Sequence, residues 1–212
     1  MKTRASLILG GLSILFFSAP SPAEHTSGFY VKPYLGISYM NDVTNNKNTA
    51  PIEIELDKGL VLGTAFGYHF TKNFAAELAW EYRSNDSETQ VGNLLYPEGN
   101  YAANIFFVNG LYYFSPIASV RPYLGLGLGW IQEIDIDLER EGVERSFSSS
   151  GNFTYQGFIG VEYQLSSNWR LHTELRHAGA KSGNLKDERT GELLANLNYK
   201  PFTWQLGFSY LF

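Results

Sequence analysis

In two segments of the chain, charged side chains are separated by even numbers of positions. The two sets are Glu77, Glu81 and Arg83, and Arg170, His172, Glu174 and Arg176. Such groups could support two kinds of chemistry. A carboxylate or an imidazole can act as a general acid or base, and opposite charges that are buried together can form ion pairs. Because a spacing of two places side chains on one face of a β-strand, the strands that carry these residues decide which chemistry is available.

The C-terminal segment shows most clearly what kind of strand this is. Every second residue from Phe202 to Phe212 is large and apolar, and the residues between them are small or polar except Leu211. A period of two indicates a strand with two different faces, one of which is almost entirely aromatic here. A soluble sheet rarely exposes such a stripe, so we interpret the aromatic face as one that contacts lipid.

Residues 1–23 have the pattern of a cleaved secretory signal. Two basic residues precede a short apolar run at 7–17, and small residues lead up to Ala23. These features are typical of export signals, so we expect cleavage after Ala23 and one mature domain, 24–212. The alternative is an uncleaved anchor, which is disfavoured because the run is shorter than the roughly 20 residues that span a bilayer.

The composition narrows the class of protein further. The chain has no cysteine, which excludes a disulfide scaffold. Aromatic residues make up 16 % of the chain, charged residues only 17 %, and the formal net charge is −5. A negative net charge without a basic segment indicates no nucleic-acid partner.

Segments of period two, separated by turn residues, predict eight strands in the mature chain. We expect apolar and aromatic side chains on their outward faces, and glycine, polar and charged side chains on their inward faces. The expected strands are Phe29–Met40, Leu60–Phe70, Phe74–Arg83, Ala103–Phe114, Arg121–Leu138, Phe153–Leu165, Trp169–Arg176 and Phe202–Phe212.

Two local features follow from the same pattern. Pro33 predicts a bulge in the first strand, because proline has no N–H for the ladder. In the fifth strand, strict alternation directs the side chains of Ile134 and Ile136 outward and those of Glu133, Asp135 and Asp137 inward.

The links between the strands alternate in length. The second, fourth and sixth strands are followed by short links, and the long, polar links are Asn41–Lys58, Ser84–Asn100, Glu139–Asn152 and Lys181–Asn196. Short periplasmic turns and long extracellular loops are typical of outer-membrane barrels. We therefore predict an all-β, eight-stranded antiparallel up-and-down transmembrane β-barrel with both termini in the periplasm. A soluble lipocalin-like barrel is the alternative, but it would carry its apolar residues inside.

The chain resembles the eight-stranded outer-membrane β-barrel superfamily, which includes the OmpA transmembrane domain and opacity-type porin-like surface proteins. The segments Val108–Phe114 and Pro122–Gly129 and the terminal strand carry the resemblance. It implies location in the bacterial outer membrane and insertion by the barrel-assembly machinery. The aromatic residues that would serve as the assembly signal are Trp204, Phe208, Tyr210 and Phe212.

The interior of such a narrow barrel must be filled by side chains. Inward glycines make room for them, at Gly63, Gly67, Gly125, Gly127, Gly129 and Gly160. The tight turn at 166–168 places Glu162 opposite His172. We predict a salt-bridged plug, and the alternative is a narrow porin for small solutes or ions. The expected interior charge network is Lys32, Glu77, Glu81, Arg83, Glu162, Arg170, His172, Glu174 and Arg176.

A lipid A-modifying enzyme is a further alternative. The segment Arg176–Gly179 is similar to the end of the motif of lipid A deacylases, whose catalytic residues lie on the outer wall. That family has His and Ser four and two residues before the alanine, where this chain has Glu174 and Arg176. Both of these side chains are expected to point inward, so we predict no enzymatic activity, no cofactor and no metal site.

The remaining expectations concern partners. His177 and Lys200 fall at the outer ends of the last two strands, where they could contact lipopolysaccharide phosphates. The acidic links around Asp86 and Glu98 match no calcium-loop spacing. We expect a structural or adhesin-like surface role, in which the loops contact a host or other surface ligand.

Overall fold

The computed structural model describes residues 27–40, 43–45, 52–56, 58–140, 143–180, 184–191, 193–196 and 200–212. The expected signal sequence and its cleavage site at Ala23 lie outside these residues. In the described part of the chain, no helix is long and apolar enough to cross a membrane.

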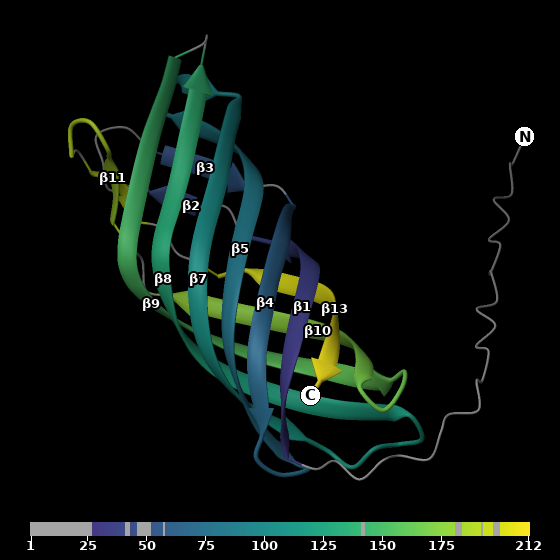
Figure 1. The fold of residues 1–212 in the computed structure, drawn as a ribbon. Coiled ribbons are helices and arrows are strands. Elements are labelled where there is room, and N and C mark those ends of the chain that lie inside the picture. The colour runs from purple at the N-terminus through teal and green to yellow at the C-terminus, as the bar shows by residue number, and fades with distance from the viewer. Residues whose placement is uncertain are drawn as a thin grey trace, which may run out of the picture.

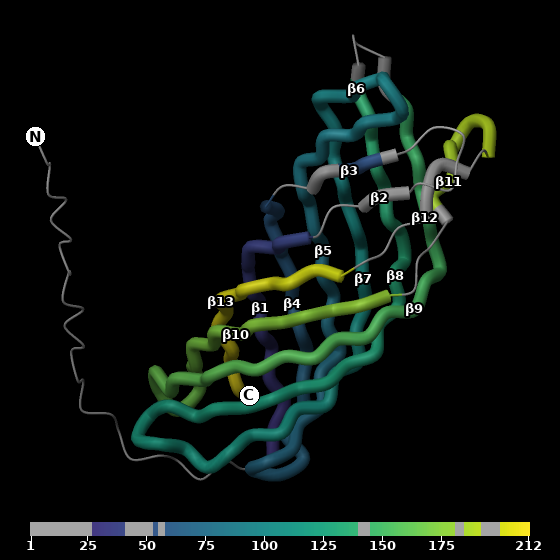
Figure 2. The backbone as a smooth tube through the Cα atoms, turned by 180° about the vertical axis from the view of Figure 1, so that it is seen from behind, coloured from purple at the N-terminus to yellow at the C-terminus, as the bar shows by residue number. Residues whose placement is uncertain are grey.

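Eight antiparallel strands form a closed ring, which confirms the predicted fold class (Figures 1 and 2). The ring order is β10, β13, β1, β4, β5, β7, β8 and β9, and β9 pairs with β10 to close it. The strands of the ring are β1 (Gly28–Tyr39), β4 (Gly59–His69), β5 (Phe74–Val91), β7 (Glu98–Tyr113), β8 (Val120–Arg140), β9 (Val143–Gln164), β10 (Trp169–Ala180) and β13 (Phe202–Leu211).

The ring has two different ends. The turn end carries the short links after β4, β7 and β9 and the C-terminus, where the Phe212 amide donates to the Phe29 carbonyl at 3.0 Å. The loop end carries the remaining short strands, which are β2 (Val43–Asn45), β3 (Ile52–Leu56), β6 (Leu94–Tyr96), β11 (Asn184–Asp187) and β12 (Leu193–Asn196).

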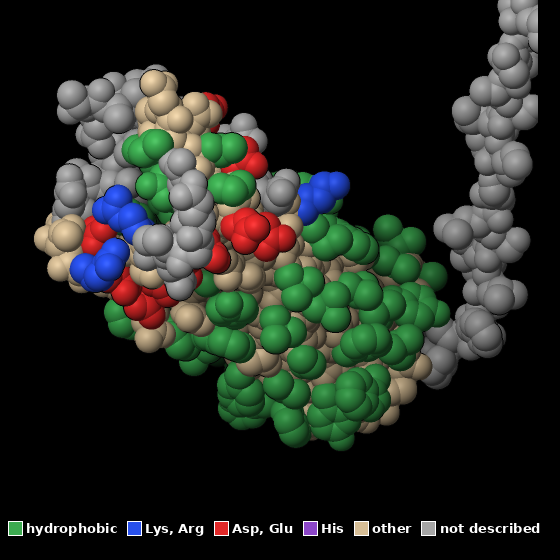
Figure 3. Space-filling model, turned by 90° about the horizontal axis from the view of Figure 1, so that it is seen from above, with side chains coloured by type: hydrophobic (Ala, Val, Ile, Leu, Met, Phe, Trp, Pro, Cys, Tyr) green, Lys and Arg blue, Asp and Glu red, His purple; other side chains and the backbone are tan. Residues whose placement is uncertain are grey.

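The outer face of the ring is apolar and the inner face carries the polar residues. Large exposed side chains such as Phe66, Leu126 and Phe208 cover the wall, whereas Lys32 and Glu174 are buried inside. Figure 3 shows hydrophobic side chains covering the barrel wall, whereas the basic and acidic side chains in view lie outside this hydrophobic area. This arrangement is the inverse of a soluble barrel and suits a wall that faces lipid.

The prediction of a bulge at Pro33 is wrong. The register of β1 is constant on both sides, from Gly28↔His69 to Ser38↔Gly59 against β4 and from Tyr30↔Leu211 to Tyr39↔Phe202 against β13. The pairing with β13 is interrupted only between Val31 and Tyr34. The missing N–H of proline therefore costs ladder contacts on one side without inserting a residue.

The side-chain directions expected for the upper part of β8 are also wrong. The register against β7 shifts by one residue at Gln132, since Asn104 pairs with Glu133 and Ile105 with Ile131. A bulge reverses the parity beyond it. The side chains of Ile134 and Ile136 are therefore buried inside, and the outward residues of this part of β8 are Glu133, Asp135 and Asp137.

Two of the four links that the sequence predicts as loops are mainly strand. Residues 84–91 continue β5, and both β8 and β9 extend through most of 139–152. Figure 1 shows β5, β7, β8 and β9 rising well beyond the ends of β1, β4 and β13. We call the first four strands with their extensions the tall side, and β4, β1, β13 and β10 the short side; β4 adjoins β5.

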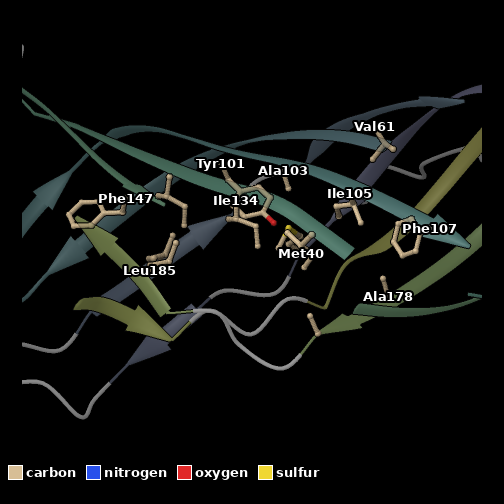
Figure 4. Packing of buried hydrophobic residues seen from close by; sticks show 14 of the residues in the cluster. Met40, Val61, Tyr101, Ala103, Ile105, Phe107, Ile134, Phe147, Ala178 and Leu185 are labelled. Carbon is tan, nitrogen blue, oxygen red and sulfur yellow. The ribbon is translucent and has the colours of Figure 1, made fainter. Parts of the chain in front are cut away.

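A buried apolar cluster fills the loop end of the barrel and continues toward the turn end (Figure 4). β7 and β8 contribute most of it, including Ile105, Phe107 and Ile134. Leu185 of β11 and Ile54 of β3 are completely buried in the same cluster. The loop end therefore has a packed core of its own above the polar part of the barrel interior.

Inward aromatic rings lie opposite glycine on the neighbouring strand. Tyr123 pairs with Gly160, and a Cβ on that glycine would lie 2.5 Å from Cζ of the Tyr123 ring. Tyr34 covers Gly63 and Tyr30 covers Gly67 in the same way. The glycines thus provide the space that lets large rings pack inside a narrow barrel.

This packing predicts that Gly160→Ala destabilises the barrel by about 1–3 kcal/mol, because the added methyl group overlaps the Tyr123 ring. The measurement is urea-induced unfolding in lipid vesicles, followed by tryptophan fluorescence. Gly110→Ala is the matched control, since a Cβ at Gly110 meets no atom within 4 Å. Equal stability of the two variants would contradict the steric role of Gly160.

Candidate functional site

The structure places all nine predicted network residues inside the barrel. Each is almost completely buried, and together they form three groups of ion pairs. The nine residues are Lys32, Glu77, Glu81, Arg83, Glu162, Arg170, His172, Glu174 and Arg176.

Lys32 lies at the centre of the largest group. Its Nζ is 2.5 Å from Glu77 Oε1 and 2.9 Å from Glu174 Oε1. The lysine comes from β1, Glu77 from β5 and Glu174 from β10. A single ammonium group therefore joins carboxylates from strands on both sides of β1.

Glu174 is the most heavily bonded carboxylate in the described interior. Arg176 Nε donates to its Oε2 at 2.7 Å, and Gln205 Nε2 donates to the same oxygen at 2.8 Å. The Tyr123 hydroxyl donates to Oε1 at 2.7 Å. Such a set of donors compensates for the cost of burying the charge.

The second group lies nearer the loop end. Arg83 Nε donates to Glu81 Oε1 at 2.6 Å. The same guanidinium donates through Nη1 to the hydroxyls of Ser38 and Thr203, at 3.0 Å and 2.8 Å. One arginine thus fastens β5 to β1 and β13 across the interior.

The third group lies toward the turn end and contains a serine, a histidine and a carboxylate. Arg170 Nε is 3.2 Å from Glu162 Oε1, a diagonal contact, since Glu162 pairs with His172 and Arg170 with Gln164. His172 Nε2 is 2.8 Å from Ser209 Oγ, but its Nδ1 is 4.0 Å from Glu162 Oε2, too far for a hydrogen bond. Ser209 and His172 are only 2 % and 3 % exposed, so a substrate cannot reach them.

Several members of the interior network were not predicted. Tyr30 donates to Glu77 Oε1 at 2.9 Å, and Gln156 donates to Asn109 Oδ1 at 2.7 Å. The strand parity could have identified Tyr30, which lies two residues from Lys32, and Tyr123, which lies two residues from Gly125. Their chemistry was missed because tyrosine suits both a lipid-facing and an inward position.

Arg121 is a further unpredicted residue and closes the turn end. Its Nε donates to the Phe114 carbonyl at 3.1 Å, its Nη2 donates to the Lys72 carbonyl, and the guanidinium lies 4.8 Å from the Tyr113 ring centroid. Two turns distant in sequence are therefore held together by one buried side chain.

At the loop end, an ion pair fastens β11 to β9. Arg145 Nη2 donates to Asp187 Oδ2 at 2.7 Å, and Asp187 Oδ1 accepts from the amides of Arg189 and Thr190. The guanidinium and the amide donors lower the pKa of Asp187 to about 2. The carboxylate therefore remains ionised at any pH at which the cell lives.

Asp135 has the opposite environment on the neighbouring strand. Partial burial, and then the charges of Glu133, Glu188 and Asp137, raise the pKa of Asp135 to about 6. The amide of Glu188 donates to the Ser146 carbonyl, so this repulsion opposes the seating of the β11 segment on β9.

The residues expected to contact partners lie on the outer surface. His177 and Lys200 are exposed at the loop-end limit of β10 and β13, and His177 pairs with Phe202. Within the described residues, no three His, Asp or Glu side chains form a metal-binding group. The outward residues expected to form the assembly signal are Trp204, Phe208, Tyr210 and Phe212.

We predict that Arg83→Ala lowers the free energy of unfolding by about 3–5 kcal/mol, because Glu81 is then buried without its cation. Urea-induced unfolding in vesicles measures the effect. Replacing both partners, as in Arg83→Met with Glu81→Leu, should recover most of the loss, and Arg189→Ala on the surface should change little. A double variant no more stable than Arg83→Ala would contradict the ion-pair explanation.

The raised pKa of Asp135 predicts a pH dependence at the loop end. Because the folded protein binds this proton more tightly than the ordinary pKa of 3.8 would allow, stability rises as the pH falls through 6 toward 4. Hydrogen-exchange protection factors of β11 amides at pH 7.5 and 5 test this. Asp135→Asn should give high protection at both values, and an unchanged pH dependence in that variant would rule out Asp135 as the cause.

Comparisons with known proteins agree with this architecture. A family model described as outer membrane protein beta-barrel domain matches residues 9–212. The outer membrane protein AlkL of Ectopseudomonas oleovorans is 24 % identical over 101 residues. That match covers 48 % of this chain and 43 % of AlkL, so the chain aligns with less than half of that relative's length.

Solved structures show the same fold at low sequence identity. OprG from Pseudomonas aeruginosa has a TM-score of 0.63 at 16 % identity, covering 89 % of this chain and 98 % of its own. Neisserial surface protein A has a TM-score of 0.56 at 15 % identity, covering 89 % and 100 %. AlkL in lipid bilayers has a TM-score of 0.52 at 18 % identity, covering 94 % and 96 %.

The family model spans nearly the whole chain and the ring has the expected eight strands. The chain therefore belongs to the outer membrane protein beta-barrel domain family of the bacterial outer membrane.

Proposed function

We propose that this protein is a closed outer-membrane barrel whose working part is its loop end, which acts in surface interaction. The observation that carries the proposal is the interior charge network. Lys32 Nζ lies within 3 Å of a carboxylate oxygen of both Glu77 and Glu174. An eight-stranded barrel is narrow, and side chains fill its interior. The network therefore acts as a salt-bridged plug.

The tall side supports the second half of the proposal. By the rule that outer-membrane barrels have short periplasmic turns, the loop end is extracellular. β5 and β7–β9 extend there as paired strands with a buried core, so they form a rigid platform. At its tip, Leu94 and Leu95 of β6 are 49 % and 45 % exposed. Exposed apolar side chains on a rigid support are typical of a binding surface.

An enzymatic role has less support. The inward Ser209–His172 pair is inaccessible. Glu174 and Arg176, which occupy the positions of His and Ser in the lipid A deacylase motif, are also buried inside. We therefore propose a non-catalytic protein. The aromatic stripe from Trp204 to Phe212 is the element that we propose the barrel-assembly machinery recognises, because it lies outward on the closing strand.

A second candidate function is the passage of small apolar molecules. The loop-end interior is filled by an apolar cluster rather than by charges, which is unlike a porin lumen. At the level of Phe107 and Ala79, both members of that cluster, the outer wall has an apolar hollow of about 760 Å³. Its outward lining includes Trp80, Phe106 and Trp130.

Planar-bilayer recordings test the closed barrel. The plug predicts no steady conductance at neutral pH, because paired charges block water and ions. A large, steady conductance from correctly folded protein would overturn the plug and favour a porin.

The surface role predicts a loss of adhesion when the tip is made polar. Cells that express Leu94→Ser with Leu95→Ser should adhere less to host-cell monolayers than cells with the wild-type protein. Asn93→Ser, in the same turn, is the control and should behave as wild type. Equal adhesion of wild-type and non-expressing cells would refute an adhesin-like role.

The second candidate is tested by the entry of the apolar dye 1-N-phenylnaphthylamine into cells with and without the protein. Faster entry without ion conductance would favour apolar passage over surface interaction.

A further inference from the structure

We propose that the outer rim of the short side binds the phosphate groups of an anionic lipid in the outer leaflet. This inference rests on the outer-membrane location of the protein and is independent of any ligand of the tall side. Its basis is a row of basic and aromatic residues that the fold assembles from strands distant in sequence.

Three strands of the short side, β1, β4 and β13, end at one level, and β10 continues beyond it to Ala180. Tyr39 of β1 pairs with Phe202 of β13, and Phe202 pairs with His177 of β10. All three side chains are exposed on the outer wall. The row therefore marks the upper limit of the apolar wall on this side, the level at which lipid headgroups begin.

Lys58 completes the row from the other side and could not be recognised from the sequence. It immediately precedes β4, whose Gly59 pairs with Ser38. Its Nζ lies 5.7 Å from the centroid of the Tyr39 ring. An aromatic ring within cation–π distance of the ammonium group holds the lysine at the rim.

Lys200 adds a second cation beside His177. The Ala178 amide donates to the Pro201 carbonyl at 3.1 Å, so the chain from Lys200 into β13 runs alongside the end of β10. The Lys200 side chain is exposed. An ammonium group and an imidazole N–H thus lie at neighbouring positions of the same rim.

The spacing of these groups indicates the kind of ligand. Lys58 and His177 are separated by three strand spacings, or roughly 14 Å at about 4.8 Å per strand. A single phosphate cannot bridge that distance, whereas a lipid with two phosphate groups can contact Lys58 with one and the His177–Lys200 pair with the other. The occupant that we infer is therefore a bisphosphorylated lipid of the lipid A class.

The outer faces of β5 and β8 carry acidic side chains at and above this level. Exposed carboxylates on β5 begin with Asp86 and Glu88, and β8 carries Glu133 and Glu139 on its outer face. These groups repel phosphate, so an anionic lipid is directed to the short side.

Tyr155 borders the row on β9. Its hydroxyl lies 2.8 Å from the position that a Cβ on Gly179 would occupy, so the ring folds over the end of β10. The exposed phenol can donate to a headgroup oxygen next to His177 and Lys200.

Native mass spectrometry of the protein in phosphatidylcholine nanodiscs tests the proposal. Adding bisphosphorylated lipid A should give bound protein, monophosphorylated lipid A should bind more weakly, and inorganic phosphate should not bind. The variant Lys58→Gln/His177→Gln/Lys200→Gln should bind bisphosphorylated lipid A at least about tenfold more weakly.

The matched control removes the same number of basic groups elsewhere, as Lys72→Gln/Lys186→Gln/Arg189→Gln. It should bind like the wild type, and so should Lys58→Arg/Lys200→Arg, which keeps both charges. Thermal unfolding without lipid A should be equal for all variants, since the rim side chains are exposed. Wild-type binding by the rim variant, equal loss in the control, or equal binding of dephosphorylated lipid A would each overturn the site.

Discussion

Burial of charge inside a narrow barrel is the constraint on which the rest of this structure depends. A wall that faces lipid leaves the interior as the place for polar side chains within the apolar band. Lys32 shows how the constraint is met, because one ammonium group contacts carboxylates from β5 and β10. The remaining oxygens of Glu174 are then bonded by Arg176 and Gln205. Small residues such as Gly160 allow the rings around this network to pack, so the charges, the rings and the glycines form one interdependent core.

The unequal height of the wall determines the outer chemistry of the molecule. On the tall side the strands continue above the lipid-facing band, and their outer faces become acidic while an apolar core is kept inside. On the short side β1, β4 and β13 end at the band, where Lys58 and His177 are exposed. A bisphosphorylated lipid and a protein partner would therefore meet different faces of the same barrel.

The sequence predicted the parts of the structure in which one face is apolar and the other polar. The eight strands, the outward aromatic stripes and the pairing of Glu162 with His172 follow from strict alternation and a tight turn. The upper parts of β5 and β9 could not be predicted in this way, because polar residues occupy the outer face of a strand that leaves the membrane. The bulge at Gln132 has no turn residue in its own strand to reveal it, and it reversed the directions expected for Ile134 and Asp135. Contacts such as that of Arg121 with two separate turns depend on the closure of the ring and have no local signal.

The central claim is that charges from separate strands are joined inside the barrel. A double-mutant cycle between Lys32→Met and Glu174→Gln, with the free energy of unfolding measured in lipid vesicles, tests it most directly. The structure predicts a coupling energy of about 1–3 kcal/mol between these residues, which are in direct contact although 142 positions apart. Additive effects, to within about 0.5 kcal/mol, would show that the two charges do not meet and would contradict the account.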